Sequence, residues 1–274
     1  MNYRYKLLFA AMLLLLFPLT HQAQTRHFKF EDSAASEGFT TTSNSRSGFE
    51  AHYAVKQMQL VTVTDNGYTG EHIRYGKGIF LPANAGQPDI PSESRFVAIP
   101  NGATVNATLK NCKKQIIQNV DLMAAAPIPS DTDDRPATHE KDRSIYGNDA
   151  FFPAHPVNIS EVLNFRGVQV VALTITPYQY NPVTKELIVY YDMDIALDYE
   201  GGDGGYGEDR LRSPFFDPIL QNALCNYDQL PVVDYEARVR ERSNRDTGCE
   251  YLIVIPNNEG FRAPAQMLAD FRNR

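Results

Sequence analysis

Cysteine and histidine are the residue types best able to act as nucleophiles or metal ligands, and neither forms a pattern that predicts a site. Three cysteines are too few for a disulfide scaffold, and the sequence does not say which two would pair in an oxidising compartment. We expect Cys112, after a strand, and Cys225, at the end of a short helix, to be structural. The histidines lack ligand spacing, so we expect surface imidazoles and neither metal nor cofactor: His27, His52, His72, His139, His155.

Clustered charge marks two polar segments. Residues 127–148 contain acidic and basic side chains with almost no apolar residue, which predicts an exposed loop with three basic residues, Arg135, Lys141 and Arg143. Residues 238–245 carry four arginines in quick succession, Arg238, Arg240, Arg242 and Arg245. The whole chain of 274 residues has a net charge of -7, which argues against a nucleic-acid partner.

The first 23 residues have the layout of a secretory signal peptide. Arg4 and Lys6 precede an apolar run from residue 7 to 17, and Pro18 ends it. The run is too short for a stable membrane anchor, and no later stretch is long and apolar enough. We therefore expect cleavage after Ala23 and no permanent membrane anchor.

Alternation of apolar and polar residues predicts a mainly β chain. We expect a flexible lead-in over residues 24–52, with one short strand at 28–31, and an antiparallel β-sandwich over residues 53–232. Residues 187–198 alternate most clearly, and we expect them to form a hairpin with residues 168–176 through the turn at 181–184. Asp217 is the predicted N-cap of a short helix that follows.

The period changes near the end of the chain. After a linker at 233–249, residues 252–255 are continuously apolar and residues 261–272 have helical spacing. One strand-helix unit has no second strand to pair with, so residues 250–274 are interpreted as the truncated start of an α/β domain.

The order of several motifs resembles the precursors of gingipain-type cysteine peptidases. The most specific segment is Ile-Thr-Pro-Tyr-Gln-Tyr-Asn-Pro at 175–182. The others are Pro-Asp-Ile-Pro at 88–91, Arg-Phe-Val-Ala-Ile-Pro at 95–100, Phe-Phe-Pro at 151–153, Phe-Arg-Gly-Val at 165–168, Ser-Pro-Phe-Phe at 213–216 and Leu-Cys-Asn-Tyr at 224–227. Residues 250–272 resemble the first strand and helix of the caspase-like peptidase domain.

This resemblance implies a prodomain that keeps its peptidase latent and assists its folding until proteolysis removes it. It also implies a cysteine peptidase partner in cis, and export through the periplasm by the type IX machinery to the cell surface or beyond. The catalytic His-Cys dyad is absent, since no histidine follows His155 and Cys249 precedes the apolar strand. We therefore assign no catalytic residue and expect this chain alone to be inactive.

The resemblance also gives the basic clusters possible roles. Family prodomains offer a basic residue on an exposed loop, so Arg135, Lys141 and Arg143 are candidates for blocking the peptidase, with ordinary solvated charges as the alternative. Residues 238–245 are candidate processing sites, with a solvated linker as the alternative.

A different class of function is also open. A secreted β-sandwich could be a binding or adhesion module with no peptidase partner. Tyrosines at 178, 180, 190 and 191 would then supply stacking faces for sugar, although β-propensity explains them equally well.

Overall fold

The computed structural model describes residues 25–31, 36–75, 83–128, 131, 136–244 and 251–272. The chain divides into two compact units, Met1–Pro231 and Val232–Arg274, and each is considered by itself. The first unit contains every strand that the structure assigns among these residues.

The largest sheet of the first unit is antiparallel and centred on one long strand. Its members are β2 (Gly38–Ser45), β3 (Gly48–Ala54), β7 (Ala103–Ile117), β11 (Tyr178–Asn181) and β12 (Glu186–Gly201). Strand β12 pairs with β7 along one edge, and with β11 and then β3 along the other. The chain around β12 is therefore hydrogen-bonded on both sides for most of its length.

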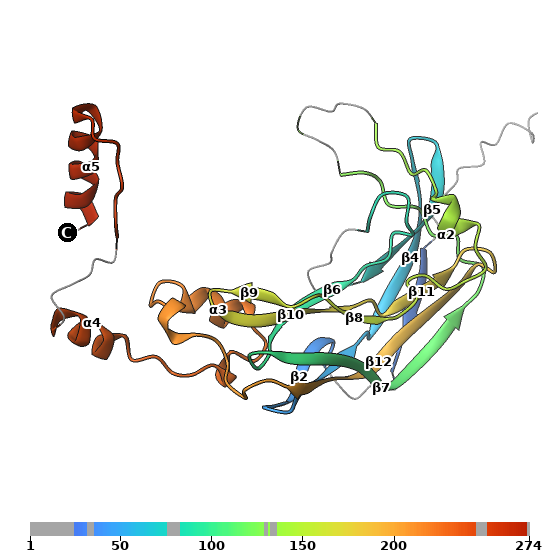
Figure 1. The fold of residues 1–274 in the computed structure, drawn as a ribbon. Helices are drawn as coiled ribbons and strands as arrows, with labels where there is room; N and C mark the ends of the chain where they lie inside the picture. The colour runs from blue at the N-terminus through green and yellow to red at the C-terminus, as the bar shows by residue number, and fades with distance from the viewer. Residues whose placement is uncertain are drawn as a thin grey trace, which may run out of the picture. The chain divides into compact units, whose positions relative to one another are not determined.

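Two smaller antiparallel sheets complete the unit (Figure 1). In one, the central strand β10 pairs with three others; the sheet comprises β6 (Glu93–Ala98), β8 (Val157–Ile159), β9 (Leu163–Phe165) and β10 (Val168–Ile175). The other has the order β1 (Thr25–Lys29), β4 (Gln57–Asp65) and β5 (Tyr68–Tyr75). The mainly β, antiparallel fold class predicted from alternation is confirmed.

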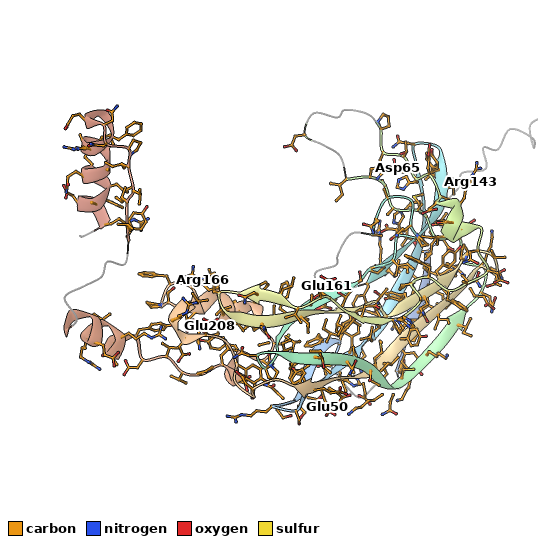
Figure 2. All side chains as sticks on the ribbon, in the orientation of Figure 1. Glu50, Asp65, Arg143, Glu161, Arg166 and Glu208 are labelled. Carbon is orange, nitrogen blue, oxygen red and sulfur yellow. The ribbon has the colours of Figure 1, made fainter. Side chains whose placement is uncertain are left out.

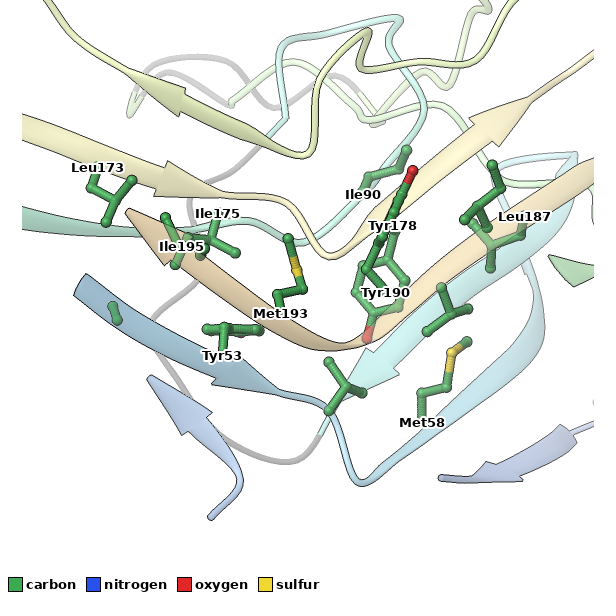
Figure 3. Packing of buried hydrophobic residues seen from close by; sticks show 14 of the residues in the cluster. Tyr53, Met58, Ile90, Leu173, Ile175, Tyr178, Leu187, Tyr190, Met193 and Ile195 are labelled. Carbon is green, nitrogen blue, oxygen red and sulfur yellow. The ribbon is translucent and has the colours of Figure 1, made fainter. Parts of the chain in front are cut away.

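The sheets cover one another's apolar faces, as a sandwich requires. Figure 3 shows Leu173 and Ile175 of β10 close to Met193 and Ile195 of β12, with Tyr53 of β3 beside them. All five are at most 2% exposed and belong to a single apolar cluster. The cluster supplies the hydrophobic free energy that holds the sheets together.

The lead-in prediction for residues 24–52 was wrong in extent and character. Residues 25–29 form β1, which pairs with β4, and most of residues 38–52 lie in β2 and β3. Phe49 and Ala51 are buried, because alternate residues of β3 face the core. The Ser and Thr side chains that suggested loose chain instead lie in β2, at the edge of the sheet.

The hairpin prediction had the right turn but the wrong partner. The turn at 181–184 joins β11 to β12, whereas β10 belongs to a different sheet. Thr176 and Pro177 separate β10 from β11, and the Pro177 carbonyl accepts a hydrogen bond of 2.8 Å from the Tyr190 amide. The proline provides no amide donor here, so the ladder is interrupted and the chain passes between sheets.

Short helices complete the first unit. They are α2 (Arg143–Tyr146), η1 (Asp209–Leu211), α3 (Asp217–Ala223) and η2 (Tyr227–Gln229). The predicted N-cap of α3 was wrong, since Phe216 holds that position and makes no side-chain cap bond. The Asp217 carboxylate instead bonds Arg212, so a buried ion pair takes the place of the cap.

The described residues of the second unit, 232–244 and 251–272, contain two helices. Helix α4 (Tyr235–Asn244) occupies most of the predicted linker, and α5 (Glu259–Arg272) begins two residues before the predicted helix. Residues 251–256 are not assigned to a strand, and Leu252 and Val254 are 74% and 84% exposed. Over the described residues, none of the helices is both long and apolar enough to cross a bilayer.

The packing predicts that Ile195→Ala will lower the free energy of unfolding by about 2–5 kcal/mol, because it leaves a cavity in the shared core. The exposed Asp198 on the same strand provides the control, and Asp198→Ala should change stability by only about 0.5 kcal/mol. Urea unfolding of both variants measures the difference; equal losses would contradict this assignment of the core.

Candidate inhibitory loop and junction

A short extended segment, residues 121–125, leads into the predicted loop. On one side the Glu71 amide donates to the Asp121 carbonyl at 2.7 Å, and the Met123 amide donates to the Glu71 carbonyl at 3.0 Å. On the other side the Asp89 amide donates to the Met123 carbonyl at 2.9 Å, and the Ala125 amide donates to the Gln87 carbonyl at 2.8 Å. The segment is thus held by backbone bonds on both edges.

Residues 136–142, in the second half of the predicted loop, return to the same place. Asn66, in the turn between β4 and β5, donates its side-chain amide to the Ala137 carbonyl at 3.1 Å. The Asp142 amide donates to the Gly86 carbonyl at 2.9 Å, and the Asp142 carboxylate caps α2 through Ser144. Residues 121–125 and 136–142 together are called the loop base below.

Two lysines hold Asp121 at the loop base. The Lys141 Nζ lies 2.8 Å from one carboxylate oxygen of Asp121, and the Lys185 Nζ lies 3.3 Å from the other. Burial alone would raise the pKa of Asp121, but the hydrogen bonds and charges of both lysines outweigh it and hold that pKa below its ordinary value. Lys141 also lies over the Tyr146 ring at 4.9 Å, so it joins the loop base to α2.

The three candidate blocking residues differ in what holds them. Lys141 is engaged by Asp121 and Tyr146. Arg143, the first residue of α2, is exposed, and within the described residues its guanidinium makes no recorded hydrogen bond or ion pair. Figure 2 labels it at the same end of the domain as Asp65. Arg135 lies outside the described residues, in the chain between the two halves of the loop base.

A buried ion pair holds the last part of the first unit. The Arg212 guanidinium contacts both carboxylate oxygens of Asp217, at 3.1 and 2.6 Å, and Arg212 is 5% exposed. The same guanidinium donates to the Pro231 carbonyl and lies near the Tyr227 hydroxyl, at 3.2 Å. These contacts hold the chain up to Pro231 in place. Removing one partner would leave an uncompensated buried charge, which is strongly destabilising.

The predicted processing sites follow Pro231 in the sequence. Arg238 and Arg240 are in α4, where Arg238 lies over the Tyr235 ring and Arg240 faces Glu236 one turn earlier at 3.7 Å. The backbone of Arg242 is also in α4, but its side chain is outside the described part of the chain. Arg245 and the predicted signal cleavage site Ala23 are outside it altogether.

The prediction of surface imidazoles was right for His27 and His155 and wrong for His52, His72 and His139, whose side chains are 14%, 28% and 8% exposed. The His139 side chain is only 8% exposed and contacts Ala124 and Asp65. Sequence patterns did not predict the contacts of His139 with Ala124 and Asp65, or those of Asp121, because these contacts join positions far apart in the chain. Among the described residues, no group of three His, Cys, Asp or Glu side chains lies together as a metal site would need.

The two described cysteines, Cys112 and Cys225, are free thiols. Burial raises the pKa of Cys225 to about 11, which disfavours the reactive thiolate. Cys112 lies within β7, not after a strand, and is exposed.

The tyrosines proposed as stacking faces for sugar are largely inaccessible. Tyr178 is 0% exposed, Tyr180 is 1% exposed and Tyr190 is 7% exposed. Burial also raises the pKa of Tyr180 to about 12. The partly buried Tyr191 stacks on Phe30 with ring centroids 5.0 Å apart. These side chains build the core and offer no sugar platform.

Comparison with solved structures places the fold among gingipain prodomains. A complex of the pro- and mature domains of RgpB from Porphyromonas gingivalis contains a chain with a TM-score of 0.60 and 20% identity, covering 70% of this chain and 98% of that one. A structure concerned with zymogenic latency of gingipain K, from the same organism, has a TM-score of 0.55 and 25% identity, covering 65% of this chain and 100% of that one.

The family model Propeptide_C25 matches residues 39–230, and the chain belongs to this family of gingipain-type propeptides. The chain is 28% identical to Lys-gingipain HG66 of P. gingivalis over 190 residues, which is 67% of this chain and 11% of the relative. It is 24% identical to Gingipain R2 of P. gingivalis over 234 residues, which is 82% of this chain and 30% of the relative. The chain thus spans less than a third of the length of either relative.

The lowered pKa of Asp121 predicts a specific acid sensitivity. The stabilisation from its ion pairs is fully present above the unfolded-state pKa and is lost as pH falls through the lower folded-state pKa. Asp121→Asn should therefore lower stability near neutral pH and flatten the acid limb of the curve of unfolding free energy against pH. Denaturant unfolding between about pH 2 and pH 7 tests this, and an unchanged acid limb would show that the pairs contribute nothing.

Proposed function

We propose that this chain keeps a gingipain-type cysteine peptidase latent and assists its folding until proteolysis removes the propeptide. The observation that carries this proposal is a propeptide fold with a polar loop whose two ends are fastened together at the loop base. One related structure is a complex of pro- and mature domains and the other concerns zymogenic latency, and both support the same role.

The loop base provides the physical means of inhibition. A segment whose two ends are held close together can adopt fewer conformations than a free peptide. It therefore loses less conformational entropy when it enters a substrate cleft, and its binding is stronger. The name of one relative, Lys-gingipain, points to lysine, and we propose a basic blocking residue on that ground. We propose Arg135 first and Arg143 second as the residue that occupies the cleft, because Lys141 is already paired with Asp121.

The partner is proposed to be the peptidase domain of the same precursor. Residues 250–274 are proposed as the start of its caspase-like sheet. Four apolar side chains of this segment, Leu252, Val254, Met267 and Phe271, are at least 70% exposed, as expected of an element that packs in a larger domain. Export through the periplasm by the type IX machinery, to the surface or the medium, belongs to the same proposal.

Single substitutions can locate the blocking residue. Mixing the purified chain with its mature peptidase should inhibit cleavage of a small basic substrate. Arg135→Ala or Arg143→Ala should weaken inhibition by about tenfold or more, the effect of losing one buried charge-assisted contact.

Lys141→Ala should have a smaller effect, acting only through the loop base. Lys113→Ala, on β7, is the matched control and should leave inhibition intact. If all of the loop variants inhibit as well as the parent chain, this loop does not block the peptidase.

Processing is expected at the arginine cluster. A protease binds its substrate in an extended conformation, so a site within α4 becomes cleavable only after the helix unwinds. A ten-residue helix is only marginally stable on its own, so such unwinding is accessible. We therefore expect cleavage after Arg242 or Arg245, near or beyond the end of the helix in sequence, in preference to cleavage after Arg238 or Arg240. Limited digestion of the precursor, followed by sequencing of the new N-terminus, identifies the cleaved bond. A new N-terminus upstream of Tyr206 would refute processing at this junction.

A further inference from the structure

His139 lies where the two halves of the loop base meet, and both of its ring nitrogens face oxygen atoms. The Nδ1 atom is 2.6 Å from the Ala124 carbonyl oxygen, and the Nε2 atom is 3.1 Å from a carboxylate oxygen of Asp65. The side chain is only 8% exposed, whereas that of Asp65 is 53% exposed. One imidazole therefore links residues 136–142 to residues 121–125 and to the end of β4.

These two contacts require a particular protonation state. A carbonyl oxygen and an ionised carboxylate only accept hydrogen bonds, so each ring nitrogen must carry a hydrogen to make both contacts at once. That form is the imidazolium. Neutral His139 can keep the bond to Ala124, but it then turns a lone pair toward the Asp65 carboxylate, and that contact becomes repulsive.

The groups around His139 come from three elements. Asp65 is the last residue of β4, and the Tyr68 ring of β5 lies 5.9 Å away, centroid to centroid. His72 of β5 lies 6.5 Å away with its ring nearly perpendicular, and it bonds Asp89 through Nδ1 at 2.9 Å and the Met123 sulfur through Nε2 at 3.3 Å. Each imidazole thus has its own carboxylate, which offsets the charge that protonation would bring.

We propose that His139 is the positioning residue that fastens the loop base, and that it does so in its protonated form. The proposal rests on the proposed function, because the chain between the two halves of the loop base carries Arg135, the residue proposed first to block the peptidase. Both contacts exist together only when both ring nitrogens carry hydrogens, so proton uptake is linked to fastening, and the loop base tightens as pH falls and loosens as pH rises. Latency is then stronger in mildly acidic surroundings than in alkaline ones.

Hydrogen exchange on the chain alone tests the proposal without any peptidase. The Ala125 and Asp142 amides bond Gln87 and Gly86 and report on the two halves of the loop base. Their protection factors, corrected for the intrinsic exchange rate, should rise by about tenfold as pH falls from about 8 to 6, the effect of one charge-assisted hydrogen bond.

Three variants make the test specific. His139→Gln, which cannot titrate, and Asp65→Asn should both abolish this rise, whereas His155→Gln, at an exposed histidine, should preserve it. Nitrogen-15 spectra of the His139 ring in the unmodified chain provide a second readout that does not depend on a variant folding. Both ring nitrogens should be protonated in the form that makes both contacts, and Nε2 should lose its proton first as pH rises, because neutral His139 can keep the Nδ1 bond to Ala124.

Flat protection factors in the unmodified chain, a preserved rise in His139→Gln, or a neutral His139 ring throughout would each overturn the proposal. A final arm measures inhibition of the mature peptidase over the same pH range, where the unmodified chain should lose potency with rising pH more steeply than His139→Gln. If the chain fails to inhibit at any pH, the proposed function fails, while the exchange data still decide whether His139 fastens the loop base.

Discussion

The fold depends on burying both faces of the first part of β12. Leu187 and Val189 on one face and Ile188 and Tyr190 on the other are all at most 7% exposed, so the strand requires cover from two directions. Its pairing with β7 on one edge and β11 on the other fixes the register of the chain nearby. The carbonyl of Lys185, just before β12, accepts from the Val120 amide at 2.9 Å, and in this way the core strand places the loop base.

Local periodicity was sufficient to predict the elements whose residues alternate regularly. In β12, the side that carries Leu187, Met193 and Leu197 was predicted as buried, and these three residues are at most 1% exposed. Antiparallel sheets, and the turn that joins β11 to β12, follow from the same alternation and from turn chemistry. The order of motifs gave the family, which the match over residues 39–230 confirms.

Several of the errors share one cause, since they concern contacts between residues distant in sequence. Strand β3 resembles loose polar chain until β12 pairs with it, and β10 pairs with the distant β6 and not with the predicted partner β12. His139 resembles a surface residue because its partners, Ala124 and Asp65, lie 15 and 74 positions away. Single-sequence patterns report local preference, whereas tertiary packing decides which strand edges and polar atoms meet.

The central claim is that the segment held by the loop base enters the substrate cleft of a cysteine peptidase. A photo-crosslinking residue at Ile128, whose side chain is 78% exposed on the approach to the loop, tests this most directly, with Ile116 on β7, 51% exposed, as the control position. Illumination of the complex should crosslink position 128 to residues lining the cleft, and a covalent inhibitor of the active-site cysteine should abolish that crosslink. A crosslink from position 128 that persists unchanged with the cleft blocked, or one formed equally well from position 116, would contradict the account.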